Sequence, residues 1–468
     1  MKQETYAIKG YFFEKVYKDL FETIKESFLN TWDEVCDTAE LFKGTFDEHG
    51  IFFGIGLYAY YGIIIASRFL FGFLFTALFS LIIVIGAAFA MAGLYIGFFV
   101  LATIDTIYRA IKKINNSCPH CQRKFDVPVY HCPNCGAPHK YLYPSIYGVL
   151  HHRCTCGELL PTLPINGRHK LRQSCPNCGE GIVGGLHHAT IFPVFGGRSS
   201  GKTCFINSAL NEIENIGAKN NYFYKYFYDV QGDERLRFEE YLNKGVFPES
   251  THDDNLVFYN FYFNKADQKI NNLISLCDVS GEVFQRRDTI TKQIGYRYAD
   301  SIIFVLDPLA IEDFRNEMID RGYDIASYAY STHPIADIMG AMLTSLNDLY
   351  KTENWKLHLA VVFTKADLPI FKEIFTKERI EEVKKAKKLK TTQATRDFLA
   401  EQFLSEYGEG NTLNLMKNHF TEIHYFASST TGDDHVQGKP FNSYGAAEPL
   451  LYVIKSAYKN VDINLEVE

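Results

Sequence analysis

Residues 196 to 203 read Gly-Gly-Arg-Ser-Ser-Gly-Lys-Thr, and this stretch decides the fold of the second part of the chain. It fits the pattern Gly-x-x-x-x-Gly-Lys-Ser/Thr, and it lies between the apolar run Ile191–Phe195 and the helical pattern Cys204–Ile213. In such a strand–loop–helix setting, glycines let backbone N–H groups turn inward around phosphates. The stretch therefore predicts a phosphate-binding site formed by Gly196, Gly197, Ser199, Ser200, Gly201, Lys202, Thr203 and Cys204.

Three side chains of this loop have separate predicted roles. Lys202 should reach the β and γ phosphates of a bound nucleotide, and the Thr203 hydroxyl should bind Mg²⁺. Arg198 would either stabilise the charge of a transition state, as an arginine finger does, or point to solvent or pair with an acid. We prefer the second interpretation of Arg198.

A second motif reads Asp-Val-Ser-Gly from Asp278 to Gly281, at the end of an apolar run that begins at Leu273. The Asp278 carboxylate at a strand end can hold Mg²⁺ through water, and the Gly281 amide can sense the γ phosphate. The position of this motif, about 75 residues after the phosphate loop, strengthens the prediction. Mg²⁺ is thus expected between Thr203 and Asp278.

A third motif reads Thr-Lys-Ala-Asp from Thr364 to Asp367 and follows another apolar run. The Asp367 carboxylate can accept hydrogen bonds from the ring N1–H and the exocyclic amine of guanine. Adenine does not offer that pair of donors, so such a site discriminates by hydrogen bonds left unmade. The residues of this motif expected around the base are Thr364, Lys365 and Asp367. A fourth segment, Phe426-Ala427-Ser428-Ser429, follows another apolar run and resembles the last guanine-contacting loop, which adds Ser428 and Ser429.

The order of these segments indicates an α/β fold. From His187 onward, short apolar runs alternate with helical patterns, which predicts a mainly parallel sheet with helices on both faces. With its motifs in this order, the region 187–468, about 60% of the chain, resembles a P-loop NTPase of the translation-factor-related (TRAFAC) class with a Ras-like G domain. The phosphate loop, the Asp-Val-Ser-Gly-Glu box and the closing Glu448–Ile454 segment look like bacterial double-GTPase and conflict-system GTPase domains.

This resemblance implies binding of GTP or GDP, GTP hydrolysis with Mg²⁺, and switch loops that respond to the nucleotide. Glu282 lies where many relatives carry a water-orienting Gln; its charge is unfavourable near phosphate, so hydrolysis is expected to be slow or partner-stimulated. The Mg²⁺-binding residue of the first switch is predicted at Thr251, with Ser250 as the alternative. The catalytic candidates are Lys202, Thr203, Gly281, Glu282 and Arg198.

Residues 51–104 contain one charged residue, Arg68, in 54 positions. A membrane-spanning helix needs about 20 apolar residues, so the stretch is long enough for two passes, or at most three. We predict a transmembrane hairpin over residues 51–107, with its turn near residues 68–76 and Arg68 close to a membrane interface. Basic residues directly downstream place that end in the cytoplasm, as expected for a bacterial inner-membrane protein.

Residues 1–50 are expected to form an amphipathic helix. Apolar side chains recur every three or four residues between Tyr11 and Phe46, and the other face carries Lys, Glu and Asp in similar numbers. Such a helix lies on a membrane surface or packs against another protein element. We prefer packing, because the polar face is not basic. A cleavable signal peptide is not expected, because charges run through the first 45 residues.

Eight of the eleven cysteines lie between residues 118 and 178 in four close pairs. Thiolate pairs of this kind suit tetrahedral Zn²⁺, and disulfides are not expected in a reducing compartment. Residues 112–184 are therefore predicted to form tandem zinc ribbons with two zinc sites. One ion is expected on Cys118, Cys121, Cys132 and Cys135, the other on Cys154, Cys156, Cys175 and Cys178, with His120, His131, His151 and His152 as alternative ligands.

The net charge of −7 argues against a general nucleic-acid binder, because such proteins are usually basic. The cysteine-rich region does contain a modest basic cluster of Arg153, Arg168, His169, Lys170 and Arg172. We expect the ribbons to dock the nucleotide-binding domain or an unknown protein partner, rather than nucleic acid.

The sequence admits three functions, of which we prefer a membrane-anchored GTPase switch. A dynamin-like membrane remodeller would carry long helical stalk segments after the G domain, whereas the sequence ends soon after residue 458. A membrane-perturbing effector gated by GTP would use the glycines of the apolar stretch for close helix packing. The partner, the upstream signal and the oligomeric state do not follow from the sequence.

Overall fold

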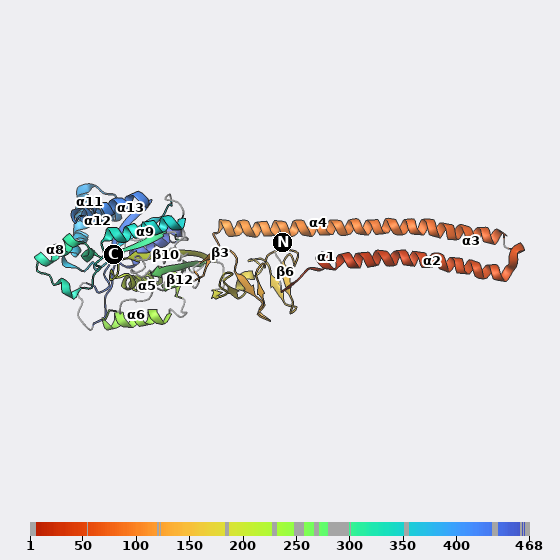
Figure 1. The fold of residues 1–468 in the computed structure, drawn as a ribbon, viewed down its shortest axis with the longest axis horizontal. Helices are drawn as coiled ribbons and strands as arrows, with labels where there is room; N and C mark the ends of the chain where they lie inside the picture. The colour runs from red at the N-terminus through yellow and green to blue at the C-terminus, as the bar shows by residue number, and fades with distance from the viewer. Residues whose placement is uncertain are drawn as a thin grey trace. The chain divides into compact units, whose positions relative to one another are not determined.

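A computed structural model describes residues 6–53, 55–118, 121, 123–182, 187–226, 232–247, 257–265, 271–278, 299, 301–350, 355–432, 439–458, 461 and 463. The chain divides into two compact units (Figure 1). The smaller unit consists of residues 1–112, 128–176 and 181–184. The larger unit consists of residues 113–127, 177–180 and 185–468.

The larger unit is built around a seven-stranded mixed sheet. Its strands are β10 (His187–Gly196), β11 (Tyr222–Tyr226), β12 (Val257–Lys265), β13 (Asn271–Asp278), β14 (Ser301–Leu306), β15 (His358–Phe363) and β16 (Glu422–Ala427). They lie in the order β11-β12-β13-β10-β14-β15-β16. Pairing is parallel from β13 through β10 and β14 to β16, and β12 pairs antiparallel with both of its neighbours.

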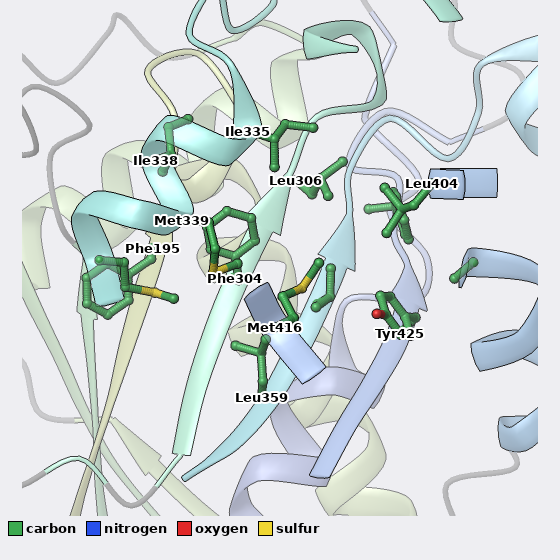
Figure 2. Packing of buried hydrophobic residues seen from close by; sticks show 14 of the residues in the cluster. Phe195, Phe304, Leu306, Ile335, Ile338, Met339, Leu359, Leu404, Met416 and Tyr425 are labelled. Carbon is green, nitrogen blue, oxygen red and sulfur yellow. The ribbon is translucent and has the colours of Figure 1, made fainter. Parts of the chain in front are cut away.

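Helices cover both faces of this sheet. The described ones are α5 (Lys202–Lys219), α6 (Gly232–Lys244), α8 (Glu312–Asp320), α9 (Ile335–Tyr350), α10 (Pro369–Ile374), α11 (Lys377–Lys387), α12 (Thr392–Glu406), α13 (Gly410–His419) and α14 (Ala447–Ala457), with short 3-10 turns η5 (Pro308–Ala310) and η6 (Ile325–Ser327). Successive strand residues point to opposite faces, so the sheet separates two cores. Ile303 and Val305 pack with α5 and α14, whereas Phe304 and Leu306 pack with α8, α9, α12 and α13 (Figure 2).

This architecture confirms the α/β prediction for the second part of the chain. β10, β13, β14, β15 and β16 run in the same direction, so the residues that follow them meet at one edge of the sheet. The three sequence motifs all lie at the ends of strands in this set. In open α/β sheets this carboxyl edge is where ligands bind.

The smaller unit contains a pair of long helices (Figure 1). Its helical segments are α1 (Tyr11–Glu14), α2 (Val16–Phe53), α3 (Ile55–Ser67), the π-helical η1 (Arg68–Gly72) and α4 (Phe73–Ile111). α2 packs against the other helix through aromatic rings: the ring centroids of Phe28 and Trp32 lie 5.9 and 6.5 Å from that of Phe73. The hydroxyl groups of Thr31 and Thr76 are 2.7 Å apart.

The predicted turn near residues 68–76 is wrong. Gly72 has helical dihedrals, φ −62° and ψ −52°, and the chain passes through η1 into α4 as one continuous helix. Among the described residues, Gly56–Ile111 is the one helix that is long and apolar enough to cross a membrane. A helix keeps its backbone groups paired in apolar surroundings, so a single arginine and one glycine do not interrupt it. Arg68 instead donates to the Thr38 hydroxyl of α2, at 2.8 Å.

Short strands occupy the cysteine-rich region, and one more strand, near the N-terminus, pairs with them. They are β1 (Ala7–Ile8), β2 (Asn116–Ser117), β3 (Lys124–Phe125), β4 (Val129–His131), β5 (Pro138–His139), β6 (His151–Cys154), β7 (Leu159–Pro161), β8 (Gln173–Ser174) and β9 (Gly181–Ile182), with the 3-10 turn η2 (Arg168–Lys170). They form sheets of order β1-β6-β7, β2-β3 and β5-β4-β8-β9. Sheets this small bury little apolar surface, so they need another source of stability.

A buried ion pair joins α4 to this region within the smaller unit. Arg168 is 2% exposed, and its Nη2 donates to both carboxylate oxygens of Asp105 at 3.2 and 3.1 Å. Its Nη1 donates to the carbonyl oxygens of Leu142 and Thr162 at 3.0 and 2.7 Å. Arg168 therefore does not contribute to the basic cluster expected from the sequence, because Asp105 neutralises its charge in the interior.

Candidate nucleotide-binding site and cysteine sites

The loop between β10 and α5 encloses the ammonium group of Lys202. Gly201 precedes the helix with φ 88°, in the left-handed region that favours glycine, and α5 then begins at Lys202. Lys202 is 7% exposed, and its Nζ donates to the carbonyl oxygens of Gly196 and Gly197 at 3.0 and 2.8 Å. The loop thus combines a buried cation with a helix N-terminus, which is the arrangement that suits a phosphate ligand.

Thr203 and Asp278 meet beside this loop. The Thr203 hydroxyl, in the first turn of α5, donates a hydrogen bond of 2.8 Å to Asp278 Oδ2. Asp278 is the last residue of β13. Burial raises the pKa of Asp278 and lowers the pKa of Lys202, while the attraction between the two charges opposes both shifts. A divalent cation and a phosphate would each supply the opposite charge that these groups need, so this oxygen pair fits Mg²⁺.

Asp367 lies at the end of β15 among hydroxyl groups from the loop after β16. The hydroxyls of Ser429 and Thr431 donate to its two carboxylate oxygens at 2.6 and 3.2 Å. The Ala366 amide donates to the Ser428 carbonyl at 3.1 Å, which joins the two loops. The structure therefore brings together the segments expected around guanine, and it adds Thr431, whose only sequence signal is the hydroxyl-rich run after β16.

The base and phosphate segments are also joined directly. The Thr364 hydroxyl donates to the Ser200 carbonyl of the phosphate loop at 2.8 Å. Cys204 lies in α5, where burial raises the pKa of its thiol to about 12, so the thiol stays neutral. Arg198 and Ser199 are exposed on the loop, and Ser199 has φ 58°.

Four predicted site residues lie outside the described part of the chain. They are Gly281 and Glu282 of the second motif, the first-switch candidate Thr251 and its alternative Ser250. Their catalytic and metal-binding roles stay predictions.

The eight clustered cysteines form two groups, and the predicted sequential pairing of these groups is wrong. Within each group the sulfur atoms all lie within 4.8 Å of one another. The groups are Cys118, Cys121, Cys175 and Cys178, and Cys132, Cys135, Cys154 and Cys156. The second group is thus nested in sequence inside the first. Spacing shows which two cysteines share a turn, but long-range strand pairing such as that of β4 with β8 decides which turns meet.

The sulfur positions fit tetrahedral Zn²⁺. With Zn–S bonds of about 2.3 Å, ligand sulfurs lie about 3.8 Å apart. The sulfur–sulfur distances are 3.5 Å for Cys118–Cys178, 3.6 Å for Cys132–Cys156 and 3.6 Å for Cys135–Cys154. Both groups could therefore hold a zinc ion.

The described histidines named as alternative ligands have other partners. His131 contacts the Gly136 carbonyl and the Ser174 hydroxyl through its two ring nitrogens, at 3.1 and 2.8 Å. The Nε2 atoms of His151 and His152 lie 3.0 Å from Asn166 and 3.1 Å from Ser145. His120 is outside the described residues.

The fold and this edge of the sheet define a P-loop nucleotide-binding domain of the GTPase type. The sequence profile of the family described as Double-GTPase 2 matches residues 190–435, which is more than half of the chain. The chain belongs to this family, and it is a GTPase.

A solved structure similar to the chain is the GTPase-like domain of Ski7 from S. cerevisiae, bound to GTP. The two are 13% identical with a TM-score of 0.27, and the match covers 57% of this chain and 49% of that chain. The chain therefore spans about half the length of the Ski7 chain. Comparison with curated proteins gives no match.

Proposed function

We propose that the protein is a membrane-associated GTPase of the TRAFAC class that works as a nucleotide-dependent switch. One observation supports this proposal most strongly: three features lie at the same edge of the sheet. They are the buried Lys202 of the phosphate loop, the Thr203–Asp278 oxygen pair, and Asp367 with its two hydroxyl donors. These are the three parts that a Mg²⁺–GTP site needs: phosphate charge, metal ligands and a base selector.

Each of these residues has a definite proposed task. Lys202 exchanges its loop carbonyl partners for phosphate oxygens. Thr203 and Asp278 hold Mg²⁺, which neutralises charge on the β and γ phosphates when bound. Asp367, oriented by Ser429 and Thr431, accepts from the N1–H and amino groups of guanine. Gly281 and Glu282 are proposed to act at the γ phosphate, and hydrolysis is proposed to be slow until a partner binds.

Nucleotide binding by the full chain in detergent tests this site. Lys202→Ala should abolish measurable GTP and GDP binding, because the phosphate charge loses its buried partner. Lys219→Ala, an exposed lysine in the last turn of the same helix, is the control and should bind like the unsubstituted protein. Unchanged GTP affinity in Lys202→Ala would sink the assignment.

The membrane part of the proposal rests on the helix Gly56–Ile111, which is apolar and unburied along its most apolar part. At about 1.5 Å per residue this 56-residue helix extends about 84 Å, whereas a bilayer hydrocarbon core is about 30 Å thick. The helix is therefore too long to be a simple perpendicular span. It either crosses with long extensions or lies along the membrane surface.

The charge on α2 favours the second arrangement. Exposed charged residues run along α2: Lys18, Asp19, Glu22, Lys25, Glu26, Asp33, Glu34, Asp37 and Glu40. Each charge at the centre of a bilayer costs about 2.5–3.5 kcal/mol. While α2 packs on α4, this side of the pair must therefore face water. We infer that the pair lies in the cytoplasmic interface, with the free apolar surface of α3 and α4 in lipid.

Cysteine labelling separates an interfacial pair from a spanning one. In sealed membranes, a membrane-impermeant maleimide should label Glu40→Cys, an exposed position on the charged side of α2, from the same side as Lys112→Cys at the end of α4. The unsubstituted chain gives the background of its own cysteines. If Glu40→Cys reacts only from the opposite side, the helix pair spans the membrane and the interfacial proposal is wrong.

The cysteine groups are proposed to bind two structural zinc ions. Their small sheets have little core, so metal binding would supply much of their folding free energy. Stable ribbons of this kind would present a surface to the G domain or to a protein partner. Through this surface, the G domain or the partner would respond to nucleotide-dependent changes in the switch loops.

A further inference from the structure

A buried carboxylate that belongs to none of the sequence motifs lies behind the nucleotide site. Asp307 directly follows β14, the strand between the phosphate-loop strand and the strand of the guanine motif. It is 1% exposed. Burying a carboxylate costs free energy unless it is paired and hydrogen-bonded, so the partners of Asp307 indicate its role.

The charged partner of Asp307 is Lys365 of the guanine motif. The ammonium group of Lys365 donates to Asp307 Oδ2 in an ion pair whose lysine side chain is 18% exposed. Lys365 also has φ 55°, a left-handed backbone conformation that non-glycine residues rarely adopt. Such a conformation persists where surrounding contacts fix it, and the ion pair is one of those contacts.

The other partners of Asp307 are two backbone amides, one in η5 directly after it and one in the segment before α9. Asp307 Oδ2 accepts from the Ser331 amide at 3.1 Å, and Oδ1 accepts from the Leu309 amide at 3.0 Å. Ser331 is 2% exposed and lies directly against the phosphate loop. A Cβ added to Gly197 would be 2.3 Å from the Ser331 hydroxyl oxygen, so only glycine lets the two segments approach this closely.

We propose that Asp307 is a positioning residue for guanine-nucleotide binding: it fixes Lys365 beside the base and, through Ser331, ties that lysine to the phosphate loop. The negative charge matters because a charge-assisted hydrogen bond is about twice as strong as a neutral one. Without it, Lys365 keeps its charge but loses its fixed place. The base side of the site then loosens while the Lys202 loop stays intact.

The test measures GDP and GTP affinity of the full chain in detergent for Asp307→Asn, Lys365→Met and the double variant. Each single substitution should weaken binding about tenfold, the loss expected for one charge-assisted hydrogen bond. The double variant should bind no more weakly than Lys365→Met, since both changes remove the same interaction. The control is Asp337→Asn, an exposed aspartate in the first turn of α9, which should be neutral.

Two outcomes would overturn the proposal: unchanged affinity in folded Asp307→Asn, or losses that simply add in the double variant. If Asp307→Asn does not fold, the comparison of Lys365→Arg with Lys365→Met tests the ion pair without changing Asp307. Arg keeps the charge and should retain affinity within a few-fold, whereas Lys365→Met should not; equal affinity of the two would refute the role of the ion pair.

This inference rests on the nucleotide site proposed above, and the experiments distinguish a failure of that site from a failure of the role of Asp307. If Lys202→Ala binds GTP normally, the site itself is misplaced. If Lys202→Ala loses binding while Asp307→Asn keeps it, the site stands and only the role of Asp307 is removed.

Discussion

His424 on the edge strand β16 is a histidine held between two carboxylates. Its Nδ1 lies 2.8 Å from Asp397 Oδ2 and its Nε2 lies 3.1 Å from Glu422 Oε1. Partial burial alone would lower the pKa of His424, but hydrogen bonds and charge from Asp397 and Glu422 outweigh it and raise the pKa. The charged imidazolium is therefore favoured in the folded protein.

The sign of the resulting pH dependence follows from linkage. A raised folded pKa means that the ion pairs stabilise the fold below the unfolded pKa of about 6.5, and that this stabilisation is lost as pH rises through the folded value. The free energy of unfolding should therefore differ more between the unsubstituted protein and His424→Gln at pH 5.5 than at pH 8.5. A difference that does not change with pH would contradict this account. His419→Gln is the control, because the ring of His419 contacts the Leu415 carbonyl rather than a carboxylate.

The residues that the sequence singles out for nucleotide binding are those whose positions depend on local geometry. Lys202 follows a left-handed glycine at a helix start, and Asp367 lies in the loop that follows β15, so a short pattern is enough to place each of them. Asp307 and Thr431 were not predicted from the sequence, because their partners lie on other strands or loops. Their partners lie 58 and 64 positions away in sequence, and no spacing rule connects them.

At the scale of elements, the end of α4 depends on the buried pair of Asp105 and Arg168. Removing one partner leaves the other charge buried, so Asp105→Ala should destabilise the smaller unit by about 3–5 kcal/mol. The double variant Asp105→Leu with Arg168→Met should cost less than the two single changes together. Denaturant unfolding in detergent measures these differences in the free energy of unfolding. Lys170→Met, an exposed change two positions from Arg168, should shift stability by at most about 0.5 kcal/mol.

The nested grouping of cysteine turns makes a prediction that the sequential grouping does not. Cys121→Ser with Cys178→Ser should leave one bound zinc ion, because both residues belong to one group. Cys121→Ser with Cys135→Ser should lose both ions. Metal analysis of the purified chain checks the stoichiometry, with Cys36→Ser as the control outside the groups. One retained ion in the Cys121/Cys135 variant would support the sequential arrangement instead.

The wrong turn in the apolar stretch and the wrong cysteine pairing have a common cause. Hydropathy shows that residues 51–104 avoid charge, but apolar sequence is equally compatible with one long helix and with two short ones. Cysteine spacing likewise defines the turns but not their partners. In both cases the deciding contacts, such as Arg68 with Thr38, join segments far apart in the chain.

At the scale of the whole molecule, the chain combines a GTPase unit with a unit that carries a long apolar helix. The α/β fold of the larger unit was predictable, because strand ends and motifs alternate in a fixed order. The smaller unit was predictable only in composition. Its helix pairing and buried ion pair arise from tertiary contacts, and they change the proposed membrane arrangement from a spanning hairpin to an interfacial pair.

The central claim is that the site at the carboxyl edge of the sheet selects guanine through Asp367. The most direct test compares the affinities of the unsubstituted protein and Asp367→Asn for GTP and XTP, with Asp337→Asn as the control. Xanthine presents a carbonyl where guanine presents an amine, so the amide should move preference toward XTP by about 100-fold or more. If Asp367→Asn folds and keeps the unsubstituted preference for GTP, the base is bound elsewhere and the account is wrong.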